Sequence, residues 1–198
     1  MSTNRLEAFS DGVLAVAITL LVLNIKVPDP ANTAHLGTAL LSQWPIYVAY
    51  VTSFATIGII WINHHAMIGR LREVDHVILF WNLLLLLSVG VLPFATSLVA
   101  AYLKLGNGQH LAAAIYSGAF LVMALMFSAL NRQILLVKPN LLAVELPEER
   151  RREIFNRAVI GIVPYVIALA LAPVSAYASL AICALVAVFY ATPRASSS

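Results

Sequence analysis

Charged residues are scarce in this chain. Asp, Glu, Lys and Arg make up 11% of its 198 residues, whereas a soluble domain carries roughly 25%. A surface in contact with water needs those charges, so their shortage excludes a water-exposed globular domain. Hydrophobic residues account for 61% of the sequence, and most of the molecular surface is therefore expected to contact lipid.

Cysteine is nearly absent as well. The single cysteine, Cys183, lies within an apolar run, so no disulfide can form within one chain. Neither this thiol nor any serine has an evident catalytic base, so the chain is not predicted to be an enzyme. The net charge of +3 is too small to favour nucleic acid as a partner.

Long apolar runs fill most of the sequence. At about 20 residues per crossing, they predict an all-α membrane protein with six transmembrane helices, and residues 1–198 form one domain. No basic segment with a small-residue cleavage site precedes the first run, so the first helix is expected to remain as an anchor. The expected helices cover residues 7–25, 38–66, 77–103 and 110–137, and a hairpin of two shorter helices lies within 155–192.

Basic residues are distributed unevenly between the two ends of these helices. With the N-terminus inside, only Lys26 and Lys104 of the twelve Lys and Arg residues fall in outer loops. Membrane proteins retain Lys and Arg on the cytoplasmic side. Both termini are therefore predicted to be cytoplasmic, in a multi-pass protein of the plasma membrane. The ten inner basic residues are Arg5, Arg70, Arg72, Arg132, Lys138, Arg150, Arg151, Arg152, Arg157 and Arg194.

Polar residues concentrate at the inner end of the first helix. Asp11 lies there, and a carboxylate at membrane depth needs a cation or several hydrogen-bond donors. Arg5 is six residues away, nearly two turns, so donors from other helices are better placed to reach Asp11. Candidate donors at the same membrane level are Trp61, Asn63, His64 and His65 near the end of the second helix, and Asn82 near the start of the third.

This group of side chains is compatible with a structural clamp, a proton relay or a metal site. His64 and His65 are adjacent in sequence, so their rings point about 100° apart on a helix. Metal ligands on one helix usually stand three or four residues apart. No metal site is therefore expected, and the clamp is the preferred interpretation.

One face of the first helix is apolar apart from a single hydroxyl. Gly12, Val16, Thr19, Leu20 and Leu23 share this face because they follow the i, i+3, i+4 spacing of a helix. Two interpretations are open. The face can be an ordinary helix–helix contact, with Thr19 bonding back to its own helix. Alternatively, it can line a narrow pore in which branched side chains form a hydrophobic gate.

The first half of the chain resembles a known family in these motifs. The pattern Arg-x3-Phe-Ser-Asp at residues 5–11, followed by the apolar run 15–23, is similar to the first-helix signature of the transmembrane-protein-175 potassium channels, and of their prokaryotic members in particular. The second half matches the family by topology and length only. Further positions that resemble the family pattern are Trp61, His64, His65, Asn82, Pro93 and Phe94.

The resemblance implies a homotetramer of six-helix subunits in which four copies of the first helix surround an ion path. It implies a gate at Val16, Leu20 and Leu23, and a ring of Thr19 hydroxyls that influences ion preference. Family members usually carry isoleucine or leucine at the innermost position, so Val16 leaves open which ring is narrowest. The residues expected in the polar network that holds the first helix are Arg5, Phe9, Ser10, Asp11, Trp61, Asn63, His64, His65 and Asn82.

Taken together, these features predict a passive, potassium-preferring leak channel without a cofactor. The family lacks a pore loop, and no Thr-Val-Gly-Tyr-Gly stretch occurs in this sequence. The expected partners are further copies of the chain, membrane lipid and permeant potassium ions. The alternative is a secondary transporter, a class that tends to carry broken helices and midplane charges.

Overall fold

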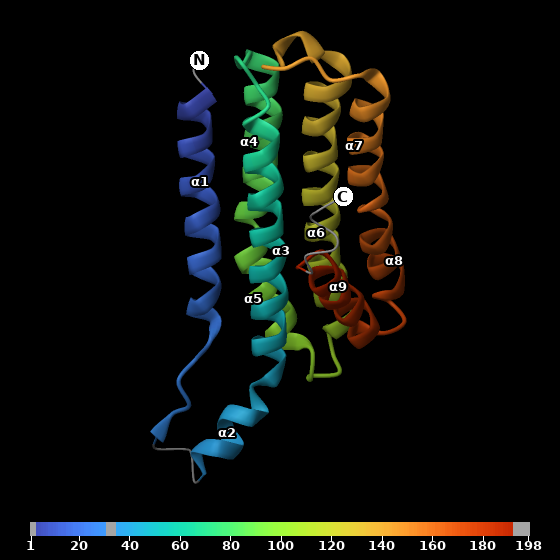
Figure 1. Cartoon of the computed structure of the whole chain (residues 1–198). Helices are drawn as coiled ribbons and strands as arrows, with labels where there is room; N and C mark the ends of the chain where they lie inside the picture. Colours follow the sequence, from blue (N-terminus) through green and yellow to red (C-terminus); the bar gives the residue numbers. More distant parts are fainter. Residues whose placement is uncertain (1–2, 31–34, 192–198) are drawn as a thin grey trace.

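The computed structural model describes residues 3–30 and 35–191, and all regular secondary structure within them is helical. Most helices run side by side along one axis, whereas α2 leans away at the end opposite the N-terminus (Figure 1). Helices dominate because a backbone in lipid must satisfy its N–H and C=O groups within its own segment. The elements are α1 (Thr3–Leu20), the 3-10 turn η1 (Leu21–Asn24), α2 (Leu36–Ser42), α3 (Trp44–Ile68), α4 (His76–Gly90), α5 (Leu92–Tyr102), α6 (Gln109–Arg132), the π-helical turn η3 (Gln133–Val137), the 3-10 turn η4 (Pro139–Leu141), α7 (Glu148–Ile160), α8 (Val163–Leu171) and α9 (Ala176–Ala191).

Prolines coincide with the breaks between helices. Pro45, Pro93 and Pro164 lie in the first turns of α3, α5 and α8, where the missing N–H leaves no helical hydrogen bond unmade. The region expected as 38–66 is two helices that meet at Gln43. The region expected as 77–103 is α4 and α5, which meet at Val91.

The first helix also differs from its expected range of 7–25. It begins at Thr3, since the polar residues that precede the apolar run, such as Arg5, favour helix as readily as apolar ones. It changes to 3-10 geometry at Leu21. α1 therefore extends beyond the apolar run, toward the N-terminus.

Five helical segments are long and apolar enough to cross a membrane. α9 is shorter: its 16 residues reach about 24 Å at 1.5 Å per residue, compared with a hydrocarbon core of about 30 Å. The fold is therefore an all-helical membrane fold with five candidate crossings and one shorter apolar helix among the described residues. The five segments are Thr3–Asn24, Trp44–Ile68, His76–Tyr102, Gln109–Val137 and Glu148–Leu171.

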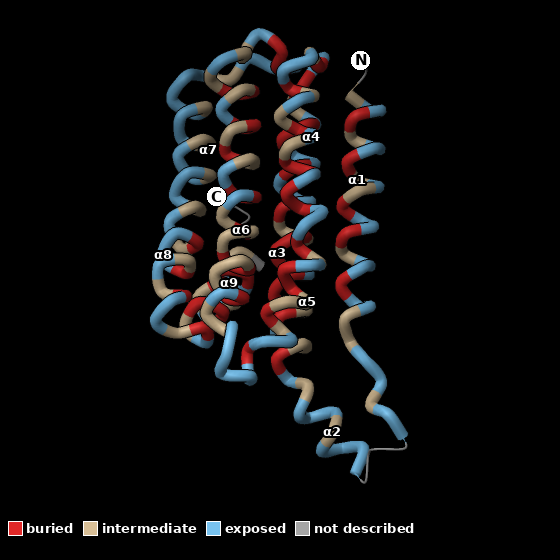
Figure 2. The backbone as a smooth tube through the Cα atoms, turned by 180° about the vertical axis from the view of Figure 1, so that it is seen from behind, coloured by how far each residue is buried: buried red, intermediate tan, exposed pale blue. Residues whose placement is uncertain are grey.

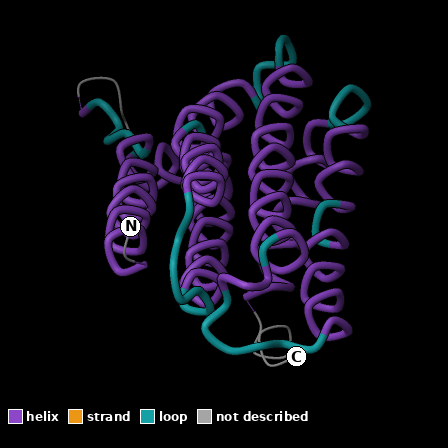
Figure 3. The backbone as a smooth tube through the Cα atoms, turned by 90° about the horizontal axis from the view of Figure 1, so that it is seen from above, coloured by secondary structure: helices purple, strands orange, loops and turns teal. Residues whose placement is uncertain are grey.

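α6 is the central helix of the bundle. It packs against α4 and α5 and also against α7, α8 and α9. Tyr116 and Phe120 of α6 are fully buried, with ring centroids 4.8 Å apart, and the Tyr116 hydroxyl lies 3.1 Å from Ser53 Oγ of α3. α1 lies at the margin of the bundle, against α3, α4 and α5 (Figures 1 and 3). One face of α1 is consequently left exposed (Figure 2).

Basic residues gather at one end of this bundle. The N-terminus, the α3–α4 loop and the segment that joins α6 to α7 lie together at the top of Figure 1. Together with the last residue of α6, Arg132, and the whole of α7, these parts contain nine of the ten basic residues expected on the inner side. The ninth, Arg157, lies in the last turn of α7, and Arg194 lies outside the described residues. The helices therefore bring together in space the basic segments that are separate in sequence.

The α3–α4 loop and the segment between α6 and α7 are hydrogen-bonded to each other at this basic end. Arg72 N–H donates to the Leu141 carbonyl over 2.9 Å, and Ala143 N–H donates to the Arg70 carbonyl over 2.8 Å. Asp75 caps α4, because its carboxylate accepts from the Ile78 N–H at 2.9 Å. The same carboxylate pairs with Lys138. These contacts join the start of α4 to the end of α6.

Replacing Asp75 by alanine removes both the cap on α4 and the partner of Lys138. We expect a loss of about 1–2 kcal/mol, the usual contribution of a capping side chain. The measurement is the melting temperature of the purified protein in detergent at neutral pH. Asp75→Asn is the matched control, since its amide oxygen keeps the capping acceptor and loses only the charge, so it should cost less.

The pH dependence of this contact has a defined sign. Burial alone would raise the pKa of Asp75, but the Ile78 N–H and the Lys138 ammonium group hold that pKa below its usual value. The ionised side chain therefore stabilises the fold above the ordinary aspartate pKa of about 3.9, and this contribution is lost as the pH falls through the lower folded-state pKa. The advantage of the wild type over Asp75→Asn should persist above about pH 5 and shrink below about pH 4. An advantage that stays constant into stronger acid would contradict the assignment.

Candidate functional site

The two faces of α1 meet different surroundings. The outward face carries Val16 and Leu20 and is continued by Leu23 of η1. These residues are 57%, 44% and 71% exposed, respectively. Thr19 is exposed on the same face. The four residues predicted for the gate therefore all point away from the rest of the subunit. The inward face is formed by the buried residues Leu6, Ser10, Leu14 and Ala17.

Thr19 is the polar group of the outward face. Its hydroxyl donates to the Val16 carbonyl of the same helix over 2.9 Å. This bond uses the only hydroxyl proton, so the oxygen lone pairs remain available to accept a hydrogen bond or to contact a cation. Because its proton is used within the helix, the Thr19 hydroxyl oxygen can act only as an acceptor on an otherwise apolar face.

A fully buried hydrogen-bond chain fixes the inward face. Asn82 Nδ2 of α4 donates to Ser10 Oγ over 3.0 Å, and Ser10 Oγ donates to the Leu6 carbonyl over 2.9 Å. His64 Nε2 of α3 lies 2.7 Å from Asn82 Oδ1. Because that amide oxygen can only accept, His64 must donate through Nε2. Its Nδ1 has no hydrogen-bond partner among the described residues.

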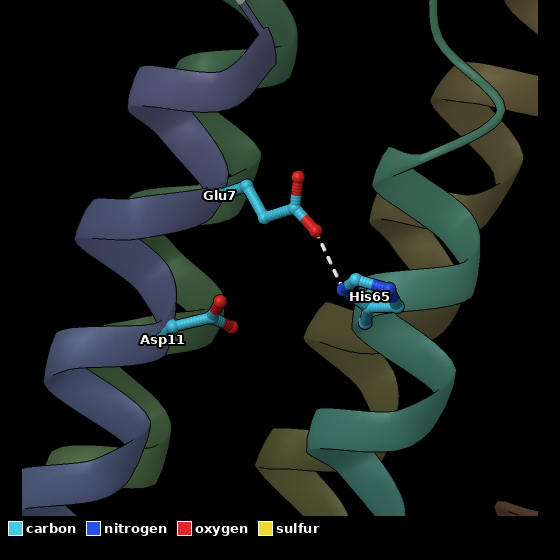
Figure 4. A group of neighbouring side chains, drawn as sticks. All are labelled: Glu7, Asp11 and His65. Carbon is cyan, nitrogen blue, oxygen red and sulfur yellow. Dashed lines mark ion pairs between the residues drawn. The ribbon is translucent and has the colours of Figure 1, made fainter.

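A second set of contacts, exposed at the surface of the subunit, joins α1 to α3. Trp61 Nε1 of α3 donates to Asp11 Oδ1 over 2.9 Å. His65 Nδ1, also of α3, lies 2.5 Å from Glu7 Oε1 (Figure 4). Glu7 was not expected in the network, although its place four residues before Asp11 puts both carboxylates on one side of the helix.

Three residues expected in the network do not join it. Asn63 donates to the Ile59 carbonyl of its own helix over 2.8 Å. Phe9 is 53% exposed on α1. Arg5 is exposed and makes no hydrogen bond or ion pair within residues 3–30 and 35–191. The remaining residues expected in one network therefore take part in two separate sets of contacts, one buried and one exposed at the surface of the subunit.

The far end of α1 is held by a contact that the sequence did not reveal. Asn24, the last residue of η1, donates through Nδ2 to the Pro93 carbonyl over 3.3 Å. Pro93 is the second residue of α5, just after the break that follows α4. In the sequence, the only indication of this contact is a polar residue, Asn24, at the end of an apolar run. Its partner could not be identified because it lies 69 residues further along the chain.

A groove with a volume of about 530 Å³ runs beside α1. Its floor includes Gly12 of α1 and Gly90 of α4, and a Cβ atom added at either glycine would meet nothing within 4 Å. The groove is therefore open where these glycines lie. The lining residues are Ala8, Phe9, Gly12, Val13, Val16, Ala17, Leu20 and Gly90.

Comparisons with known proteins agree with this geometry. Residues 5–93 match the sequence model of the family described as endosomal/lysosomal potassium channel TMEM175. A potassium channel of Streptomyces collinus is 43% identical over 192 residues, which cover 95% of this chain and 91% of that one. The endosomal/lysosomal proton channel TMEM175 of Homo sapiens is 38% identical over 112 residues, which cover 52% of this chain and 22% of that one.

A solved structure is similar over nearly the whole chain. It is the crystal structure of a lysosomal potassium-selective channel TMEM175 homolog from Chamaesiphon minutus. The TM-score is 0.85 at 39% sequence identity, and the alignment covers 96% of each chain. The similarity therefore includes the second half of the sequence, where no motif was recognised.

The buried chain should contribute more to stability than the exposed contacts. Asn82→Ala would leave the His64 and Ser10 side chains without their partner inside the membrane, a loss on the order of 1–3 kcal/mol for each unpaired group. Asp11→Ala should cost less, because Trp61 is 44% exposed and its indole N–H would not be enclosed within the protein. The melting temperature of each purified variant in detergent is the measurement.

Asn63→Ala is the matched control for this comparison. Its side chain bonds only to its own helix, so its melting temperature should stay close to that of the wild type. If Asp11→Ala were as damaging as Asn82→Ala, the division into a buried and an exposed set would be wrong.

Proposed function

The chain belongs to the TMEM175 family of potassium channels, and from this premise we propose that it is a potassium-preferring cation leak channel of the plasma membrane. The family and its relatives are ion channels, not enzymes. Potassium is the proposed permeant ion, and no cofactor takes part. Residues 1–198 form one channel domain in this proposal, with six crossings and both termini in the cytoplasm.

The observation that carries the proposal is the outward face of α1. Polar contacts hold the inward face against α3 and α4. The outward face then presents branched apolar side chains at one-turn intervals, with a hydroxyl oxygen between them. A helix face that contacts only lipid gains nothing from a hydrogen-bond acceptor such as the Thr19 oxygen. A helix face that lines an ion path benefits from it, because the oxygen can contact a permeating cation.

We propose that four copies assemble with their α1 helices around a central path. The groove beside α1, open at Gly12 and Gly90, supports this arrangement because small residues let membrane helices approach closely. The proposed assembly is thus a homotetramer surrounded by lipid.

Val16, Leu20 and Leu23 would form the hydrophobic gate of this path. Rings of apolar side chains expel water from a narrow neck, and an ion without its hydration shell then meets a high barrier. A small tilt of α1 would widen the neck and admit water and partly dehydrated cations. Val16 is smaller than Leu20 and Leu23, so the narrowest ring is proposed at one of the two leucines.

Ion preference would rest on dehydration and on Thr19. Potassium releases its water more readily than sodium, and the Thr19 oxygens could replace part of the lost hydration shell. Four hydroxyls provide fewer fixed dipoles than a carbonyl-lined filter. The expected preference for potassium is therefore modest.

A secondary transporter is the alternative, and the sequence argues against it. Residues 77–101, 111–130 and 158–190 contain no Asp, Glu, His, Lys or Arg. Transporters that couple solute movement to ions place such groups near the middle of the membrane. A passive pore needs none of them there.

Widening the gate should increase passive flux. In proteoliposomes, Leu20→Ala should raise potassium flux at least severalfold, because a smaller ring holds water more readily. Thr19→Ala should lower the ratio of potassium to sodium flux while flux continues. The readout is an ion-sensitive dye under a potassium gradient and then under a sodium gradient.

The matched control for these variants is Leu185→Ala, a truncation of a 68% exposed leucine on α9. It should leave both flux and selectivity unchanged. Wild-type flux and selectivity in Leu20→Ala and Thr19→Ala would exclude α1 as the pore lining. Absence of passive flux from correctly inserted wild-type protein would favour the transporter.

Filling the groove should prevent assembly without unfolding the subunit. Gly12→Leu adds a side chain where a Cβ meets nothing within the subunit, and leucine favours helix more than glycine does. We expect smaller particles by size-exclusion chromatography with light scattering, with helical content by circular dichroism preserved. Ala181→Leu, at an exposed alanine of α9, is the control and should assemble normally. A Gly12→Leu variant that assembles like the control would show that the groove is not a subunit contact.

A further inference from the structure

Three potential metal ligands from two helices converge at the basic end of the bundle. Glu7 and Asp11 stand four residues apart on α1, and His65 faces them from α3 (Figure 4). Each offers one ligand atom, and these atoms all lie within 4.8 Å of one another. We refer to these three residues as the Glu7–Asp11–His65 cluster.

The spacing of this cluster is close to that of a metal site. Zn²⁺ and similar ions bind imidazole nitrogen and carboxylate oxygen at about 2.0–2.2 Å, so two ligands of one ion stand about 3–4 Å apart. The His65 Nδ1 to Glu7 Oε1 distance of 2.5 Å is shorter than that. Those two atoms must separate by about half an ångström, which side-chain rotation can provide because His65 is exposed.

The chemistry of the cluster favours a transition-metal ion. As metal ligands, two carboxylates and one imidazole would present two negative charges to a dication. Mg²⁺ and Ca²⁺ prefer oxygen ligands alone, whereas imidazole suits zinc, copper, iron and nickel. Three protein ligands leave at least one position for water, as in zinc sites that exchange ligands. We propose that the Glu7–Asp11–His65 cluster binds a divalent transition-metal ion that bridges α1 and α3.

An independent contact orients one of these ligands. Trp61 Nε1 donates to Asp11 Oδ1 over 2.9 Å, and carboxylates that bind metals are typically held by such hydrogen bonds. The opposing charge nearby is Arg5 on the same helix, which is exposed and forms no ion pair with the cluster. The guanidinium group therefore does not occupy the place that the cation would take.

The sequence did not predict this site for a geometric reason. The adjacent histidines His64 and His65 point in different directions, and only His65 reaches the cluster. His64 is turned into the buried chain with Asn82. The second and third ligands come from α1, more than fifty residues away, so no spacing rule within one helix could indicate them.

Metal binding would join α1 to α3 by bonds that reach across the helix pair. On the proposed function, in which the other face of α1 lines the pore, this bridge would resist tilting of α1 and lower passive flux. That consequence rests on the proposed function. The binding itself does not, and it can be tested on protein in detergent without any flux measurement.

The test is a titration of purified, full-length, tag-free protein with Co²⁺, followed by calorimetry and by visible absorption of the bound ion. We expect one ion per subunit, displaced by Zn²⁺ and not by excess Mg²⁺ or Ca²⁺. Glu7→Gln and His65→Ala should each weaken binding at least about tenfold. His76→Ala is the matched control, because it removes an exposed histidine outside the cluster and should bind like the wild type.

The fold of each variant is checked by its melting temperature without metal, and Zn²⁺ should raise the melting temperature of the wild type and His76→Ala only. No binding by the wild type, or equal binding by Glu7→Gln and His65→Ala, would overturn the site. In proteoliposomes, Zn²⁺ should reduce flux in the wild type and not in His65→Ala. Flux that is unaffected by Zn²⁺ despite confirmed binding would overturn only the effect on α1.

Discussion

The hydrogen-bond chain from Ser10 through Asn82 to His64 determines how α1 is placed. All three side chains are fully buried, and lipid offers no replacement partner for any of them. A rotation of α1 that separates Ser10 from Asn82 would leave several polar groups unpaired. Apolar contacts alone would allow many rotations, because lipid tails and leucine side chains are equally apolar.

The rotation of α1 in turn decides which residues face outward. With Ser10 directed at Asn82, helical periodicity turns Val16, Leu20 and Leu23 away from the subunit. Exposure of these residues costs nothing in lipid, so exposure by itself does not distinguish a lipid contact from a pore. The available oxygen of Thr19 and the open groove at Gly12 are the features that favour a pore and a subunit contact.

The two ends of α1 are held by different kinds of contact. At the basic end, Glu7 and Asp11 meet His65 and Trp61 of α3 at the exposed surface of the subunit. At the other end, Asn24 bonds to the Pro93 carbonyl at the bend between α4 and α5. Ser10 of the buried chain lies between Glu7 and Asp11 in sequence, so a tilt of α1 about that chain would move the Asn24 contact more than the contacts of Glu7 and Asp11. Ion binding at the basic end and bending at Pro93 would act on the same helix.

The sequence by itself determined the membrane-embedded helical class, the uneven distribution of basic residues and the family, because lipid forces apolar runs into helices and the signature at residues 5–11 is local. It also indicated which residues share each face of the first helix. Only the tertiary structure decided that Asn82 pairs with Ser10, that Trp61 pairs with Asp11, and that Glu7 meets His65. Periodicity gives the faces of each helix separately. Which faces meet depends on the rotation and spacing of whole helices, and these are set by all their contacts together.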